Sequence, residues 1–225
     1  MTTVVFSGDP VAPRDFTREA TAQDYFPEWL VAASTLVDVT AFGRTYDQAQ
    51  WAHAFGVTQL AARLSPDISG APTLYEWFNG VAPPADASIG VDQPPAALFY
   101  SILQNTGPNL THETWADALL AADPTARGAI SQPSLSWGDK GLWEGTDYHG
   151  IDDATLLWWD PQATGPDELR REGQGMYQYV DGGRRFLPGE WETEDRLFDA
   201  TNSVALYTER PPGEAPGTYP SPAGG

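Results

Sequence analysis

The sequence has no cysteine, a single lysine and no long apolar run. Without cysteine the chain can form no disulfide, no thiolate metal site and no thiol nucleophile. No stretch approaches the roughly 20 consecutive apolar residues of a membrane-spanning helix. No basic start followed by an apolar run marks a signal peptide. We therefore expect neither a disulfide scaffold nor a cysteine enzyme, and no signal peptide or lipid anchor in this chain.

Basic residues are scarce. Twelve Lys and Arg stand against 31 Asp and Glu, which gives a formal net charge of −19. Such a surface repels nucleic-acid backbones and anionic membranes, so neither is an expected partner. The plainest role of the charge is to keep the protein in solution. With 41% hydrophobic residues, the chain can still build a folded core.

The familiar motifs of catalysis and cofactor binding are also missing. There is no G-x-S-x-G elbow, no Walker A sequence and no G-x-G-x-x-G after the first apolar run. The three histidines, His53, His112 and His149, form no H-E-x-x-H and no pair with helical metal spacing. We expect no catalytic residue, no metal and no cofactor.

Strand and helix patterns alternate over residues 1–64. The strands are expected at 3–6, 28–33 and 57–64, and the helices at 17–25 and 38–53. Helices of this length between strands imply parallel pairing through right-handed crossovers. Nearly continuous apolar strands suit a sheet that is covered on both faces. The sequence predicts an α/β fold in which residues 1–64 form a three-layer α/β/α unit with a small parallel sheet.

The remaining chain divides into three further segments. We expect a turn-rich connector at 65–72, an α+β segment with helices and a β-hairpin at 73–209, and a disordered Pro/Gly-rich tail at 210–225. Within the second segment, Thr111 is expected to cap a helix. Residues 154–160 are the best strand, and residues 175–188 read as a hairpin that turns at 181–183.

Acidic and aromatic residues gather in one stretch, "TDYHGIDDATLLWWDP" at 146–161. Its acids do not have the spacing of an EF-hand loop. We expect Asp152 and Asp153 to be solvated loop acids in front of a strand. Alternation along that strand sends Trp158 and Trp159 to opposite faces of the sheet, so these two rings form no single platform.

Nine tryptophans still leave a sugar-related function open. A carbohydrate-active enzyme or sugar-binding module would use exposed tryptophans and paired carboxylates. This alternative requires exposed, coplanar tryptophans or a pair of carboxyl groups about 5–10 Å apart in a groove. If Trp143, Trp158 and Trp191 are each buried singly, the alternative fails.

Six segments, taken in order, resemble a known family. They are "VVFSGDP", "FPEWLVAA", "YDQAQWAHAFGV", "GPNLTHETWADAL", "DYHGIDDATLLWWDP" and "GMYQYVDGGRRFLPGEW". They are similar to the C-terminal half of extracellular solute-binding proteins, the type 1 periplasmic binding proteins of the branched-chain amino-acid ABC transporter class. The resemblance covers nearly all of residues 3–192.

The resemblance implies a non-catalytic solute-binding protein, present here as a fragment with a partial type 1 periplasmic-binding-protein fold. Residues 1–64 would form most of the C-terminal lobe, and residues 73–209 would help to complete the N-terminal lobe. The implied ligand is a small polar solute such as an amino acid or amide. The implied partners are the membrane permease of an ABC transporter and a second chain that completes the lobe, outside the cell or in the periplasm. A truncated remnant without independent activity is a further alternative.

Open α/β sheets bind ligands beyond the carboxyl ends of their strands. In this sequence the residues at those positions are Ser7, Gly8 and Asp9 after the first strand, and Ser34 and Thr35 after the second. Hydroxyls and free backbone amides there would hold a carboxylate, and Asp9 would pair with an ammonium group. The alternative for Asp9 is a simple turn.

Overall fold

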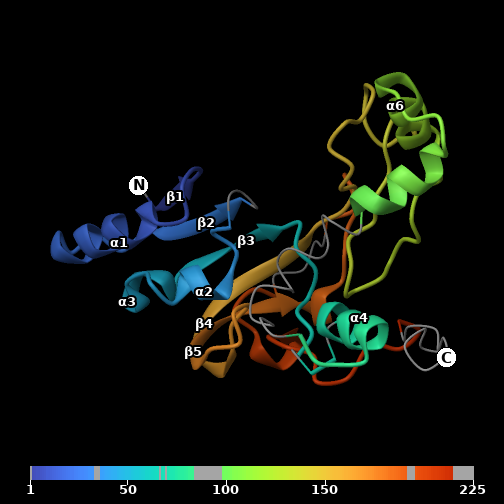
Figure 1. The fold of residues 1–225 in the computed structure, drawn as a ribbon. Helices are drawn as coiled ribbons and strands as arrows, with labels where there is room; N and C mark the ends of the chain where they lie inside the picture. The colour runs from blue at the N-terminus through green and yellow to red at the C-terminus, as the bar shows by residue number, and fades with distance from the viewer. Residues whose placement is uncertain are drawn as a thin grey trace.

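The structure is a computed structural model that describes residues 2–32, 36–65, 67–68, 70–83, 98–191 and 196–214. One mixed sheet organises the chain, with the strands in sequence order (Figure 1). The strands are β1 Thr3–Phe6, β2 Glu28–Ala32, β3 Ala54–Thr58, β4 Thr155–Pro166, β5 Glu172–Val180 and β6 Ser203–Val204. The named helices are α1 Ala12–Ala22, α2 Thr40–Gly43, α3 Gln48–Trp51, α4 Gly70–Asn79 and α6 His112–Ala121, with 3-10 turns at Asp181–Gly183 and Ala200–Asn202. Residues 98–106 are also helical.

The mixed α/β class is confirmed, and β1, β2 and β3 pair in parallel as predicted. The prediction of a small parallel sheet confined to residues 1–64 is wrong. Strand β4 pairs antiparallel with β3, β5 with β4, and β6 with β5, so the sheet has six strands. The added strands cover an edge of β3 that a three-stranded sheet would leave open. Helix α4 begins at Gly70, inside the connector predicted at 65–72.

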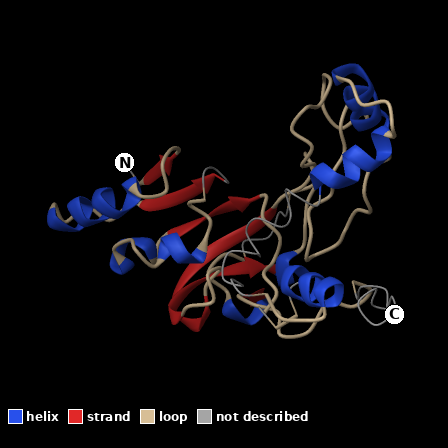
Figure 2. Ribbon diagram, viewed as in Figure 1, coloured by secondary structure: helices blue, strands red, loops and turns tan. Residues whose placement is uncertain are grey.

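The sheet carries its main core on one face. Helices α1, α2 and α3 all pack there, through Ala20, Phe42 and Trp51 respectively. The opposite face leaves Val5 on β1 and Phe198 exposed. Among the described residues of 1–64, all three helices thus lie on one face of the sheet, whereas the sequence predicts helices on both faces. Figure 2 shows the short helices beside the strands, and the helical segment around α6 standing away from them.

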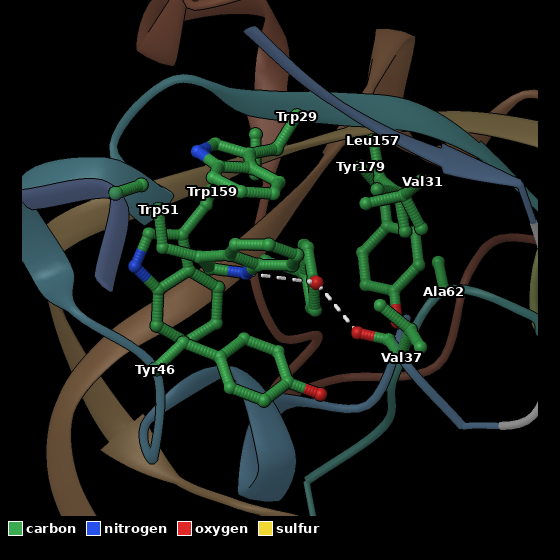
Figure 3. Packing of buried hydrophobic residues seen from close by; sticks show 12 residues of the cluster. Trp29, Val31, Val37, Tyr46, Trp51, Ala62, Leu157, Trp159 and Tyr179 are labelled. Carbon is green, nitrogen blue, oxygen red and sulfur yellow. Dashed lines mark hydrogen bonds between the residues drawn. The ribbon is translucent and has the colours of Figure 1, made fainter. Parts of the chain in front are cut away.

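Tryptophan and tyrosine rings form the centre of this core (Figure 3). Trp51 lies against Tyr46 with ring centroids 4.5 Å apart, and its indole N–H donates to the Tyr177 hydroxyl at 3.1 Å. That hydroxyl donates in turn to the Val37 carbonyl at 2.7 Å. Trp159, on β4, is fully buried and donates to Gln48 at 2.9 Å. A buried ring thus contributes its apolar area while its polar atom stays hydrogen-bonded.

The boundaries of β3 and of the early helices differ from the prediction. Strand β3 runs from Ala54 to Thr58. Its buried residues alternate over this range, at Ala54, Gly56 and Thr58. Gly56 permits the close approach to β2, since a Cβ there would lie 1.9 Å from the Val31 carbonyl oxygen. The long helix predicted at 38–53 is two short helices instead. Asp47 separates them, because its carboxylate caps α3.

The first helix also begins earlier than predicted. It starts at Ala12, with Pro13 in the first turn, where a missing N–H costs nothing. Thr17, expected as the N-cap, lies inside α1, and its hydroxyl donates to the Pro13 carbonyl at 2.7 Å. The predicted cap at Thr111 is confirmed, since its side chain accepts from the Thr114 N–H.

The hairpin predicted to turn at 181–183 is wrong, because β5 does not pair with the segment that follows this turn. Strand β5 pairs with β4 through a turn at residues 167–171. The Asp167 carboxylate holds that turn by accepting from the backbone of Leu169 and from the backbone and guanidinium of Arg171. Arg44 then ties the hairpin to the helices through the carbonyls of Gly165, Arg171, Gly173 and Gly175. The sequence obscured β4 because Pro161 interrupts it, at a point where the register shifts.

Part of the predicted disordered tail has a defined place in the structure. Arg210 donates to the Ile68 carbonyl at 2.7 Å. The Glu214 carboxylate accepts from the backbone N–H groups of Ile130 and Ser131 and from the Ser131 hydroxyl. The tail prediction therefore fails for residues 210–214, and residues 215–225 lie outside the described residues. No helix in the described ranges has the length and apolar character required to cross a bilayer.

Candidate binding pocket

A hollow of about 460 Å³ lies at the carboxyl ends of β2 and β3. Ala32, the last residue of β2, and Val57, next to the last residue of β3, line it. Ala154 joins them because β4 runs antiparallel, so that its start lies beside the end of β3. Its size is within the range of small-molecule pockets. Its place is the one where parallel strands present ligand sites.

The hollow opens on the sheet face opposite the aromatic core. On β2, Val31 is buried in the core, so its neighbour Ala32 points the other way. On β3, Val57 alternates in the same manner with the buried Thr58. The pocket is therefore separated from the aromatic core by the sheet itself.

Two half-exposed tryptophans line the hollow. Trp143 is 49% exposed and Trp191 is 45% exposed. Trp191 is supported from behind by the buried Phe186, with stacked rings whose centroids lie 6.0 Å apart. Neither indole N–H makes a hydrogen bond within the described part of the chain. Both rings thus present an apolar face and an open donor.

The alternation predicted for the other tryptophan pair is confirmed. Trp159 belongs to the core, whereas Trp158 packs on the opposite face against Phe198, with ring centroids 5.5 Å apart. Trp158 is nonetheless buried, and its N–H donates to the Ser203 hydroxyl at 3.0 Å. Of the three rings whose burial would exclude a sugar-related function, two are therefore exposed in one hollow and the third is structural.

A buried ion pair lies at the polar end of the hollow. Arg185 donates to Asp153 Oδ1 at 2.8 Å, and both side chains are almost fully buried. The same guanidinium donates to the carbonyls of Gln59 and Leu60, which follow β3. Asp153 Oδ1 also accepts from the Ser134 N–H. Asp153 Oδ2 takes no hydrogen bond from the described residues.

Asp152 is the second buried acid of the pocket. It is 3% exposed, and its Oδ1 accepts from the Ser136 hydroxyl at 2.9 Å. Its Oδ2 is enclosed and has no partner among the described residues. Burial raises the pKa of this carboxyl above its ordinary value, and the Ser136 hydrogen bond opposes that rise only in part. The prediction that Asp152 and Asp153 are solvated loop acids is wrong.

The approach to these acids follows a turn that the sequence does reveal. The Asp147 carboxylate accepts from the backbone N–H groups of His149 and Gly150. Gly150 adopts a φ of 88°, and a Cβ there would collide with the Trp137 ring. This position therefore requires glycine, and it directs residues 151–154 along the pocket into β4.

Few polar side chains line the pocket. Gln59 lies just after β3, is half-buried, and makes no side-chain hydrogen bond to the described residues. The lining contains no serine, threonine, histidine or lysine, and Arg185 beside it makes four hydrogen bonds to protein acceptors. The arrangement can stack a ligand face and exchange hydrogen bonds with it. It has no nucleophile–base pair of the kind that acyl transfer needs.

Three of the five residues predicted from the sequence follow β1 and do not line this hollow. They are Ser7, Gly8 and Asp9. The Asp9 carboxylate accepts from the Val11 N–H at 2.7 Å, which makes this segment a turn into α1. Ser34 and Thr35 lie outside the described residues. The prediction that these five residues form one binding site therefore stays a prediction.

The rule about strand ends was applied to a third strand whose predicted boundary is wrong. Placing the third strand at 57–64 puts its end near Leu64, whereas the true end at Thr58 identifies Gln59. Trp143 and Trp191 could be suspected only from their type. Nothing in the sequence signalled that Arg185 pairs with Asp153, since 32 residues separate them.

A second hollow, of about 750 Å³, lies on the segment that stands away from the sheet. Phe99, Leu103, Leu110 and Trp115 line it, next to His112 and Glu113 at the start of α6. Its walls are mainly apolar, and no buried charge or orphaned polar atom faces it among the described residues. Its chemistry therefore specifies no ligand.

Comparison of the chain with protein-family models, with curated proteins and with solved structures gave no match. The resemblance to solute-binding proteins thus stays a prediction. Within the described ranges, no group of three or more His, Asp or Glu side chains is placed to hold a metal ion.

Proposed function

We propose that this chain is a non-catalytic solute-binding protein that holds a small polar solute in the hollow at the ends of β2 and β3. One observation carries the proposal. Trp143 and Trp191, both half exposed, line one hollow together with Asp153, which pairs with Arg185, and with the unpartnered amide of Gln59. Half-exposed aromatic rings beside polar groups without a protein partner are the usual lining of a small-molecule site.

The wider expectations belong to the same proposal. They are a partial type 1 periplasmic-binding-protein fold, a fragment that a second chain completes, a location outside the cell or in the periplasm, and delivery of the solute to an ABC-type permease. Their support is the order of the six sequence segments together with the pocket's position at the strand ends. A solute held between the strand ends and the loops that carry Trp143 and Trp191 would be enclosed from two sides.

The carbohydrate-active enzyme has less support. A glycosidase needs two carboxyl groups that face a groove and reach the scissile bond. Here Asp152 Oδ2 is enclosed, and Asp153 is held by Arg185 and Ser134. The two acids act as parts of the pocket wall in this proposal.

The test is a ligand screen. Thermal unfolding and tryptophan fluorescence would be followed with amino acids, their amides, neutral sugars and small amines. A ligand that binds only the folded state raises the melting temperature with its concentration. We expect at least one class to do so in the parent protein and to lose the effect in Trp143→Ala. Tyr100→Ala, which removes an exposed ring outside the hollow, is the control.

If a well-folded sample responds to none of these classes, the proposal fails, and the remnant without independent activity becomes the better description. If a response survives Trp143→Ala and Trp191→Ala together, the solute binds elsewhere, and the hollow is not the site.

A further inference from the structure

We propose that the solute is an uncharged saccharide, which stacks on Trp143 and Trp191 and hydrogen-bonds to Asp153 and Gln59. This inference rests on the proposed function and specifies the class of its ligand. It follows from the rings, from the charges and from the unpartnered polar atoms of the hollow, which are independent of one another.

The rings select a ligand with a flat, weakly polar face. Trp143 and Trp191 come from loops far apart in the sequence, yet both line the same hollow with about half of their surface open. The C–H face of a pyranose ring covers an indole well, while its hydroxyls point outward. The Phe186 ring holds Trp191 in place, so this surface exists before the ligand arrives.

The charges select against anions. No Arg or Lys is among the described lining residues, and Arg185, which pairs with the lining residue Asp153, donates to that carboxylate and to three backbone carbonyls. A ligand carboxylate or phosphate would find no free cation among the lining residues. The protein's net charge of −19 adds a general repulsion. A zwitterionic amino acid would bring such a carboxylate into the pocket without a partner.

The charges also give no advantage to cations. Arg185 already neutralises Asp153 at 2.8 Å. Asp152 is buried, and its enclosed Oδ2 offers no surface to a ligand. The accessible part of Asp153 belongs to a carboxylate that already has a cationic partner, so an ammonium group would lose its hydration for little return.

The remaining polar atoms match hydroxyl groups. Asp153 is 6% exposed, and its Oδ2 has no partner among the described residues, so it can accept from a ligand O–H. Gln59 presents a donor and an acceptor on one side chain. The two indole N–H groups add donors. Adjacent hydroxyls, each both donor and acceptor, satisfy this mixture, whereas an aliphatic solute would leave it unpaired.

The experiment is a calorimetric titration with matched probes. Glucose, xylose, maltose and cellobiose represent neutral saccharides; glucuronate and glucosamine are the anionic and cationic counterparts of glucose; leucine and leucinamide represent the amino-acid class. We expect a neutral saccharide to bind, and the charged glucose analogues to bind at least about tenfold more weakly than the best neutral saccharide.

Variants locate the binding. Trp143→Ala and Trp191→Ala should each weaken saccharide binding by about tenfold or more, since each removes a stacking surface. Trp191→Phe should retain a part of the affinity, because a ring remains against Phe186. Gln59→Leu keeps the shape but removes both hydrogen-bonding atoms, and should also weaken binding. Tyr100→Ala should leave it unchanged, and thermal unfolding checks that each variant is folded.

The outcomes are distinct. Binding of leucine or leucinamide without any saccharide overturns the saccharide inference but leaves solute binding intact. Binding of no probe overturns both. A saccharide whose affinity does not change in the Trp143 and Trp191 variants overturns the assignment to this hollow, and equal affinity for glucose and glucuronate overturns the argument from charge.

Discussion

The aromatic core and the pocket use tryptophan in opposite ways. On the core face, Trp51 and Trp159 are fully buried, and each indole N–H has a protein acceptor. At the pocket, Trp143 and Trp191 are half exposed with no acceptor in the described chain. Hydrogen-bond satisfaction, together with burial, thus separates a structural tryptophan from one that is available for binding.

Buried acids show the same contrast. Asp167, in the β4–β5 turn, is buried too, and burial by itself would raise its pKa. The hydrogen bonds from Arg171 and Leu169 outweigh burial and hold the pKa below its ordinary value. Asp152 at the pocket has only the Ser136 donor, so burial prevails and its pKa is raised. The hydrogen bonds of the turn stabilise the charged form of Asp167, whereas the pocket wall stabilises the charged form of Asp152 less.

The largest effect should come from the core. Trp159→Ala removes a fully buried ring next to Tyr177 and should lower the free energy of unfolding by about 4 kcal/mol. Urea unfolding followed by circular dichroism measures it. A loss below about 1 kcal/mol would mean that the ring is not part of a packed core.

The next effect tests the ion pair beneath the pocket. Arg185→Ala leaves Asp153 buried without its partner and should cost about 3 kcal/mol of stability in the same assay. Arg18→Ala is the matched control, because Arg18 is exposed and its ion pair with Asp15 is long, at 3.9 Å. We expect that control to stay within about 1 kcal/mol of the parent. Equal losses in both variants would remove the distinction between them.

A smaller, pH-dependent effect should separate the two buried acids. The folded pKa of Asp152 is raised, so its ionisation penalty is absent below the unfolded value and complete above the folded one. Asp152→Asn does not titrate, and its stability relative to the parent should therefore improve as pH rises through that window. Urea unfolding at a series of pH values measures the change.

Asp167→Asn should show the opposite sign. The folded pKa of Asp167 is lowered, so its contribution is present above the unfolded value of 3.8 and is lost as pH falls through the folded pKa. The variant should be less stable than the parent at neutral pH, and the two should converge in acid. Parallel curves for both variants would contradict the contrast between the sites.

The smallest effect on stability should come from the pocket ring. Trp143→Ala should change the free energy of unfolding by less than about 1 kcal/mol, because half of the ring is already in water. A loss comparable with that of Trp159→Ala would identify Trp143 as a structural residue and would weaken the pocket proposal.

Short-range patterns in the sequence predicted much of the local structure. The parallel order of the first three strands, the Thr111 cap, the turn at Gly150 and the split of Trp158 from Trp159 all depend on neighbouring residues, and all are confirmed. The errors arose where distant residues decide. The end of β3 depends on packing against β2, and β4 contains a proline that only a register shift accommodates.

By itself, the sequence determined the α/β class, the acidic charge and the absence of thiol chemistry. Only the tertiary structure decided which acids are buried and which tryptophans meet at the pocket. The reason is physical: burial and charge pairing depend on segments that sequence spacing does not relate. Arg185, Asp153 and Gln59 become neighbours only once β4 has paired with β3.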